Sequence, residues 1–254
     1  MGLGAEFARQ IAADGTNVVL VSRDAEALGV VAREIEALGV EAEVLAADLS
    51  KRPDVARVVR RIAAADRPIE MLVNNAGYGL RHGLLRSSEA ELDDMLEVMV
   101  RAVMILSRSA GKSMASRGRG TIINVSSIAA ILATGTYSAH KAWVSSFTEG
   151  LAGELRGTGV TATAVCPGLV RTEFHARAAL DFSAYPSAVW LDSRAVVRAA
   201  LRAARRGRVI VTPSARYGLV MSIARVLPRR WIRRAGHSGA RPRGIHCSEE
   251  GTDE

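Results

Sequence analysis

The chain has 254 residues, 48% of them hydrophobic, which is enough for one large core or two small ones. Its two cysteines, Cys166 and Cys247, lie far apart and exclude a disulfide framework or a cysteine-rich metal site, so we expect a reducing compartment and no bound metal. No run approaches the roughly 20 apolar residues that span a bilayer. The N-terminus also lacks the pattern of a signal sequence, which favours a cytoplasmic protein.

The formal net charge of +8 comes from the C-terminal part of the chain. Residues 1–193 are nearly neutral, with 20 basic and 22 acidic side chains. Residues 194–248 hold 14 arginines and no acid, and the last six residues add four negative charges. Such basicity is typical of contact with nucleic acid or an anionic membrane surface, and it belongs to the C-terminal segment rather than to the main domain.

Apolar periodicity predicts alternating helices and strands along the first 212 residues. The expected strands are 17–21, 41–46, 69–73, 120–125, 160–166 and 209–211. The expected helices are one within 1–15, then 24–38, 51–65, 88–116, one that opens near Thr136, and 194–206. This alternation predicts an α/β fold, a three-layer doubly wound parallel sheet with right-handed crossovers and helices on both faces.

Polar and small residues follow several of these strands. Asp48, Asn74 and Gly77 all fall at carboxyl ends, where ligands bind in doubly wound sheets. Gly2 and Gly4 open the first helix, where small residues let a backbone approach a phosphate. Arg23 follows the first expected strand and favours a 2′-phosphate, hence NADP(H) over NAD(H), the alternative being an ordinary solvated arginine after a strand.

Tyr137 and Lys141 lie four residues apart at the start of an expected helix, so both side chains project from the same face. A neighbouring ammonium favours the phenolate, and we expect it to lower the pKa of Tyr137 from about 10. A tyrosine tuned in this way exchanges a proton with a substrate oxygen. By itself the pair is more often an ordinary solvated face.

Four motifs occur in order, each after an expected strand or at the start of a helix. They are NNAG at 74–77, NVSS at 124–127, YSAHK at 137–141 and CPGLVRT at 166–172. In this combination the chain resembles the short-chain dehydrogenase/reductase family over about residues 2–212. The resemblance implies a single Rossmann-type NAD(P)-binding catalytic domain that spans 1–212 and transfers a hydride reversibly between a nicotinamide cofactor and an alcohol or ketone. It also implies a homo-oligomer.

The resemblance assigns roles to individual residues. Tyr137 is expected to be the general acid/base, Lys141 to lower its pKa and hold the nicotinamide ribose, and Ser127 to hydrogen-bond the substrate oxygen. The cofactor-binding residues it implies are Gly2, Gly4, Arg23, Asp48, Leu49, Asn74, Ala76, Gly77, Tyr137, Lys141, Pro167, Gly168 and Thr172. Asp48 is expected beside the adenine, and Pro167, Gly168 and Thr172 are expected to flank the nicotinamide.

The sequence departs from the family pattern in three places. Gly2 and Gly4 match the last two glycines of the family's phosphate loop, but its central first strand, threonine and first glycine are not in the sequence. We expect unpaired edges on the neighbouring strands, and we interpret the difference as a misplaced start or as a damaged protein.

The second departure is Met99, which takes the place of a usual asparagine that anchors a relay water, a role that a thioether cannot fill. The third is the gap between Ser127 and Tyr137, which is about three residues shorter than usual and leaves Ser126 as a possible substitute for Ser127. His140 points off the Tyr137–Lys141 face, and we expect it at the surface.

The segment 173–193 contains Phe174, Phe182, Tyr185 and Trp190 where the family keeps its substrate-covering loop. It favours an apolar ketone or alcohol, acyl-chain-like or steroid-like, although these aromatic residues equally well close the core. The segment 213–235 is expected to form a basic amphipathic helical extension, on an anionic bilayer or as a cap on the last strand or a second subunit. Nucleic acid is less favoured because no recognition module accompanies the charge, and 236–254 are expected to be disordered.

Two hypotheses follow. The first is an NADP(H)-dependent oxidoreductase, favoured by Ser127, Tyr137 and Lys141 together. The second is a catalytically impaired or inactive relative that acts as a binding or membrane-associated module, favoured by Met99 and the absent first strand.

Overall fold

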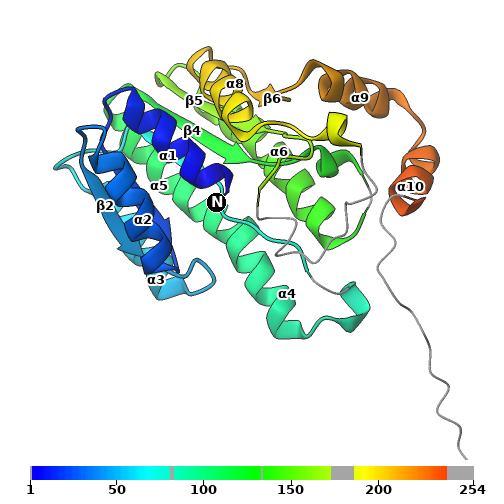
Figure 1. Ribbon diagram of the computed structural model, residues 1–254, viewed down its shortest axis with the longest axis horizontal. Coiled ribbons are helices and arrows are strands. Elements are labelled where there is room, and N and C mark those ends of the chain that lie inside the picture. Colours follow the sequence, from blue (N-terminus) through cyan, green and yellow to red (C-terminus); the bar gives the residue numbers. More distant parts are fainter. Residues whose placement is uncertain (1, 81–82, 133, 173–185, 239–254) are drawn as a thin grey trace, which may run out of the picture.

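The computed structural model describes residues 2–80, 83–132, 134–172 and 186–238. Parallel strands lie between two layers of helices (Figure 1), so the predicted α/β architecture is confirmed. The strands are β1 (Val18–Ser22), β2 (Ala42–Ala46), β3 (Met71–Asn74), β4 (Gly120–Val125), β5 (Val160–Val165) and β6 (Ile210–Val211). The helices are α1 (Leu3–Ala13), α2 (Ala25–Glu36), α3 (Arg52–Ala63), α4 (Glu89–Leu96), α5 (Val103–Ser116), α6 (Thr136–Glu154), α8 (Ser193–Arg205), α9 (Ala215–Val226) and α10 (Arg229–Ser238).

Short helical turns connect these elements. They are η1 (Leu84–Arg86), the π-helical η2 (Glu97–Ala102), η3 (Ile128–Ile131) and η4 (Ser187–Val189). Side chains cap several helices as the sequence leads one to expect. The Asp24 carboxylate accepts from the Ala27 amide at 2.9 Å, and Ser88 with Glu91 forms a capping box at the start of α4.

The strands form two separate parallel sheets. β1 pairs with β2, for example Leu20 opposite Val44, and the order of the second sheet is β3-β4-β5-β6. Among the described residues no strand pairs with the outer edge of β1 or with the outer edge of β3. The expectation of unpaired edges beside an absent central strand is therefore confirmed within the part of the chain that the structure describes.

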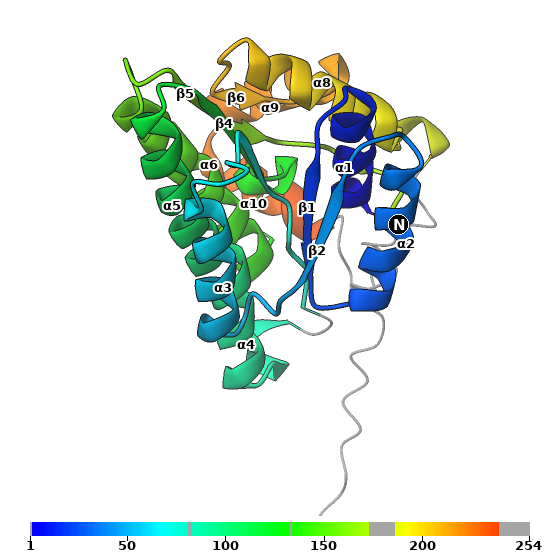
Figure 2. The ribbon, with the colours of Figure 1, turned by 90° about the vertical axis from the view of Figure 1, so that its left-hand side faces the viewer.

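Helices cover both faces of the sheets (Figure 2). On one face α1 and α8 bury Phe7 and Val197 against Val165 of β5. On the other face α3, α5 and α6 enclose Leu106 and Ile122. Helices α1 and α2 also cover β1 through a smaller cluster. At about 25 cal/mol per Å² of buried apolar surface, these clusters provide the main stabilisation of the fold.

The predicted helix 88–116 is interrupted by the π-helical turn η2 between α4 and α5. One wide turn of this kind inserts an extra residue and rotates the buried face of the following helix. Periodicity alone did not indicate the interruption, because the residues within η2 are apolar enough to continue a regular helix. The turn buries Val98 and Met99 beside the site described below.

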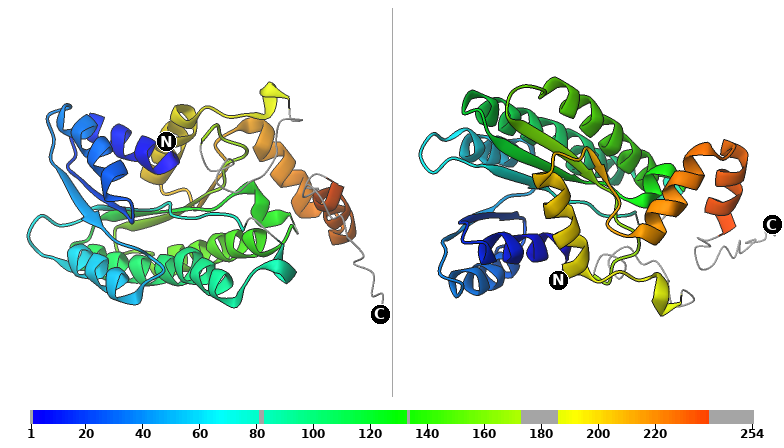
Figure 3. Two further views of the ribbon diagram at one scale, coloured as in Figure 1. Left: turned by 60° about the horizontal axis from the view of Figure 1, so that its bottom comes forward. Right: turned by 90° about the horizontal axis from the view of Figure 1, so that it is seen from above.

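Helices α9 and α10 follow β6 at one edge of the molecule (Figure 3). Pro228 lies between them, and α10 continues to Ser238, so the expectation of disorder is wrong for 236–238. Within the described residues, no helix combines the length and the apolar character that crossing a membrane requires.

Candidate active site

A large cleft runs between the two sheets and along the carboxyl ends of their strands, with a volume of about 2320 Å³. Every site residue expected from the sequence lines it. These residues are Gly2, Gly4, Arg23, Asp48, Leu49, Asn74, Ala76, Gly77, Ser127, Tyr137, Lys141, Pro167, Gly168 and Thr172. The fold thus brings together residues that lie as much as 170 positions apart in the sequence, from the first helix to the loop that follows β5.

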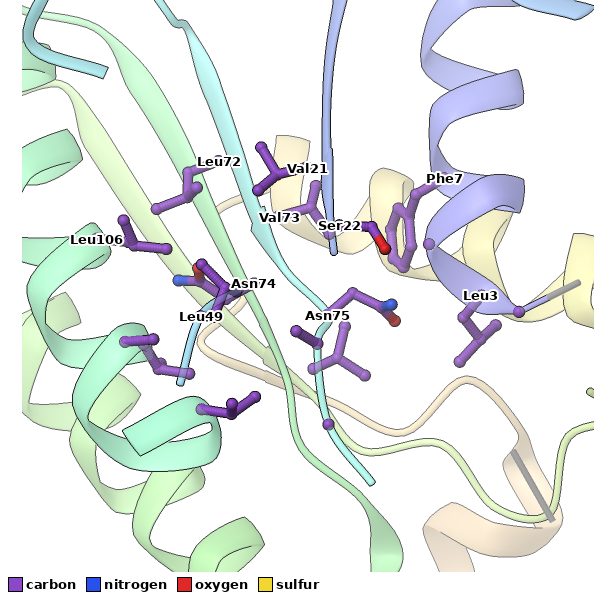
Figure 4. A pocket seen from close by; sticks show the side chains of 18 of the residues that line it. Leu3, Phe7, Val21, Ser22, Leu49, Leu72, Val73, Asn74, Asn75 and Leu106 are labelled. Atoms are coloured by element: carbon purple, nitrogen blue, oxygen red, sulfur yellow. The ribbon is translucent and has the colours of Figure 1, made fainter. Parts of the chain in front are cut away.

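The inner part of the cleft separates β1 from β3 and has apolar walls (Figure 4). Leu3 and Phe7 approach it from α1, while Leu72 and Leu106 lie on the opposite side. Val21 and Val73 come from the two strand edges themselves. We call this inner part the inter-sheet slot. It joins unpaired backbone edges to apolar walls, which is the environment of a buried parallel strand.

The three expected catalytic residues lie together at the other end of the cleft. Ser127 lies two residues after the end of β4 and accepts a hydrogen bond from the Ala129 amide at 3.1 Å. Tyr137 and Lys141 project from the first turns of α6. Tyr137 hydrogen-bonds Ser127, and the Lys141 ammonium lies 5.7 Å from the centre of the tyrosine ring. The shorter connection between Ser127 and Tyr137 therefore still brings the two hydroxyl groups into contact.

The expectation of a lowered tyrosine pKa is wrong for this structure. Burial raises the pKa of Tyr137 to about 12, and the hydrogen bond with Ser127 only partly opposes that shift. The Lys141 ammonium does not lower it, because Nζ donates to the Val125 carbonyl at 2.7 Å rather than to the phenol. Desolvation therefore outweighs the cation, and Tyr137 is a protonated donor at neutral pH.

Lys141 is itself perturbed, since complete burial lowers its pKa to about 8. Between pH 8 and 10 the unfolded chain holds a proton on this lysine that the folded chain has released, so the free energy of unfolding rises with pH. The folded chain at neutral pH thus tolerates a buried ammonium at a cost of about 3 kcal/mol, at 1.36 kcal/mol per pKa unit.

We expect Lys141→Met to lose this pH dependence. Chemical denaturation should show that the free energy of unfolding of the parent chain rises by about 2–3 kcal/mol more than that of the variant between pH 7.5 and 10. Lys112→Met provides the control, because this lysine is exposed on α5 and does not line the cleft. Parallel curves for the parent chain and Lys141→Met would contradict a depressed lysine pKa.

Ser126 is not placed to replace Ser127. Its side chain is buried, donates to the Lys141 carbonyl at 2.7 Å and bonds the Ser145 hydroxyl at 2.8 Å. These contacts fix the turn of α6 that carries Lys141. His140 is partly exposed rather than fully at the surface, and its partial burial lowers its pKa.

Met99 lies within the site, as its sequence position indicates. It is buried with Met95 and Val98 in a cluster that packs against Tyr137. A β-carbon built on Gly77 would stand 3.4 Å from Lys141 Nζ and 3.7 Å from Met99 Cε, so both side chains approach this glycine. A thioether therefore stands near the catalytic helix at the sequence position where the family pattern has an amide.

Asn74 lines the cleft, but its amide is committed to the protein interior. Its Nδ2 donates to Asn124 Oδ1 at 2.8 Å and to Ser107 Oγ at 3.0 Å, and Asn124 donates onward to Thr148 Oγ1 at 3.0 Å. Buried amides joined in this way tie β3 and β4 to α5 and α6. The network therefore positions the end of β3 and the Tyr137 helix.

The adenosine end of the expected cofactor site contains both charged candidates. Hydrogen bonds from Ser50 hold the pKa of Asp48 below its ordinary value, with a smaller contribution from the Arg23 guanidinium. Arg23 is exposed directly after β1. An ionised carboxylate, which accepts hydrogen bonds, and an arginine, which donates them, thus stand at neighbouring strand ends.

The phosphate end depends on the start of α1. Gly2 is its N-cap, no side chain caps the helix, and the first turn lines the cleft. Gly4 meets Asn75, whose Nδ2 would lie 2.7 Å from a β-carbon at that position, so any larger residue there would displace the Asn75 amide. Asn75 was not among the predicted site residues, although it belongs to the NNAG motif.

Tyr217 of α9 also lines the cleft, and sequence reasoning did not indicate it. Its ring lies directly over Gly168, where any β-carbon would overlap it. Its hydroxyl donates to the Val189 carbonyl at 2.8 Å and accepts from the Leu169 amide at 3.5 Å. Tyr217 thereby joins the loop after β5 to the η4 turn. No motif could have revealed it, because the contact spans 48 residues of sequence.

The structure describes only part of the aromatic segment 173–193. Phe174, Phe182 and Tyr185 lie outside the described residues, whereas Trp190 stands 6.0 Å from the Arg171 guanidinium.

Comparison with known proteins agrees with this geometry. A family model for short chain dehydrogenases matches residues 1–181. The ketoacyl reductase HetN of Nostoc sp. is 33% identical over 172 residues, which are 66% of this chain and 60% of the relative. A short-chain dehydrogenase from Sphingobium yanoikuyae, solved in complex with NADPH, has a TM-score of 0.80 and 28% identity and covers 96% of this chain and 94% of its own. A solved 7beta-hydroxysteroid dehydrogenase has a TM-score of 0.82 and 26% identity, over 93% of each chain.

The chain belongs to the short-chain dehydrogenase family, a family of Rossmann-type oxidoreductases. It spans about three fifths of the length of the HetN reductase that it matches.

Proposed function

We propose that the chain is an NADP(H)-dependent oxidoreductase that interconverts an apolar ketone and a secondary alcohol. The observation that carries the proposal is the convergence of Ser127, Tyr137 and Lys141 at one end of a cleft whose other end holds Asp48 and Arg23. Ketoacyl and steroid substrates both appear in the names of similar proteins, which supports an acyl-chain-like or steroid-like ketone.

In this proposal a bound nicotinamide supplies or accepts the hydride. Ser127 donates a hydrogen bond to the carbonyl oxygen, and Tyr137 gives that oxygen its proton as negative charge develops. The raised pKa of Tyr137 keeps the proton in place until that moment. Lys141, whose Nζ donates to the Val125 carbonyl, holds the nicotinamide ribose. The α1 N-terminus and Arg23 receive the phosphates.

The proposal is tested by titrating the chain with NADPH and NADH and then adding a β-ketoacyl thioester or a steroid ketone. We expect NADPH to bind more tightly and its absorbance to fall on addition of a ketone. Arg23→Ala should weaken NADPH binding by about tenfold, the equivalent of one charge-assisted hydrogen bond, and should leave the affinity for NADH nearly unchanged. Arg60→Ala, an exposed arginine of α3, is the matched control. An equal effect of Arg23→Ala on both cofactors would contradict the phosphate role.

The second candidate is a non-catalytic relative, and two observations favour it. Met99 stands at the sequence position of a polar relay group and packs against Tyr137, and the inter-sheet slot leaves β1 and β3 without a shared partner strand in the described residues. A folded chain that binds neither cofactor, with or without a strand in the slot, would favour this candidate. A homo-oligomer and a Rossmann-type domain over 1–212 remain predictions for both candidates, and that domain is catalytic in the first of them.

A further inference from the structure

We propose that α9 and α10 form a docking surface for an anionic lipid bilayer. Leu219, Val220, Ile223 and Val226 follow one another at helical spacing along a single side of α9. Leu227 comes next at the C-cap, and we call these five residues the α9 stripe. Val226 is 82% exposed and Leu219 is 64% exposed. Trp231 of α10, 60% exposed, continues the apolar surface past Pro228.

The opposite side of the same two helices packs against the rest of the domain. Met221 and Ile232 are buried, and the Tyr217 ring packs on Gly168. The hydroxyl bond from Tyr217 to Val189 holds α9 in this orientation. The α9 stripe therefore cannot turn inward without breaking contacts that line the cleft, and none of the residues that the structure describes covers it.

Charge decides which occupant fits. Arg216 stands at one end of the α9 stripe, and Arg229 and Arg230 are exposed at the other. No acidic residue occurs from 194 to 248. A second copy related by a two-fold axis would place these arginines against their equivalents, which like charges disfavour. Anionic headgroups instead pair with the arginines while the apolar row enters the acyl boundary, at a depth of about 5–10 Å.

The surface is tested with the full chain and no substrate or cofactor, so the result is independent of the proposed enzymatic function. Flotation with phosphatidylglycerol-containing vesicles should recover the protein, whereas pure phosphatidylcholine vesicles should not. Val226→Glu should weaken binding tenfold or more, because it places a carboxylate within the apolar row. Leu85→Glu is the matched control, since Leu85 is 97% exposed in η1, away from the two helices, and it should bind as the parent does.

The arginines are tested separately. Arg229→Ala with Arg230→Ala should weaken binding about fivefold per residue, and rising salt should have the same effect. Arg60→Ala should have no effect. Tryptophan emission should shift to the blue with anionic vesicles and should lose that shift in Trp231→Phe. Circular dichroism confirms that each variant is folded.

Three results would overturn the proposal. One is absence of binding to the anionic vesicles, and another is equal binding to neutral ones. The third is that the chain does not bind vesicles but forms a dimer that Val226→Glu dissociates. The α9 stripe would then be an interface between two copies.

Discussion

Tyr137→Phe should reduce ketone turnover about 1,000-fold while leaving NADPH affinity within about threefold. The hydroxyl is the only group that changes, and removing a positioned general acid typically costs about 10²–10⁴ in rate. The ring remains to pack against the Met95–Val98–Met99 cluster, so folding and the shape of the cleft should persist. Steady-state kinetics and a fluorescence titration of the same preparation separate the two effects.

Tyr78→Phe is the matched control for this change. Tyr78 lines the same cleft and packs on the same apolar cluster, but it is not part of the proposed proton path. It should retain turnover within a few-fold of the parent. If Tyr137→Phe also retained turnover, the acid/base role would be wrong, whatever the cofactor affinity.

A strand placed in the inter-sheet slot should stabilise the protein and tighten cofactor binding. We suggest fusing about five apolar, β-branched residues and a glycine-containing turn ahead of Gly2. Gly4 meets Asn75 immediately after β3, so a segment that enters α1 through the slot runs in the same direction as β1 and β3. New ladder bonds to both edges and burial against Phe7 and Leu106 should outweigh the ordering cost by roughly 4 kcal/mol.

The same fusion should bind NADPH about tenfold more tightly, because the added strand holds the phosphate-facing end of α1 in place against β3. Thermal melting and fluorescence titration provide the two measurements. A fusion of equal length with proline at alternate positions is the control, since proline cannot donate to a ladder, and it should gain neither stability nor affinity. Equal gains by both fusions would mean that the slot does not accept a strand.

Much of this fold could be predicted because its signals are local. Apolar runs bounded by glycine and polar residues located all six strands to within two residues, and the spacing of Tyr137 and Lys141 placed both on one side of α6. The carboxyl-end positions of Asp48 and Gly77 located the cleft, since parallel strands share that edge. These features depend only on helix and strand periodicity and on sheet connectivity.

Other features depend on which groups meet in space. The pKa of Tyr137 rises because the fold buries the ring and directs the Lys141 ammonium to a backbone carbonyl, which spacing alone cannot show. The Asn74 network and the η2 turn arise from packing between elements that are distant in sequence.

By itself, the sequence determined the order of the elements, the family and the residues that gather at the cleft, because each is encoded in short patterns. Only the tertiary structure decided that apolar side chains from both sides line the slot between the two sheets. It also decided that Tyr217 closes over Gly168 and that the α9 stripe faces outward. The physical reason is that pairing, burial and desolvation are properties of contacts between segments, and no single segment contains them.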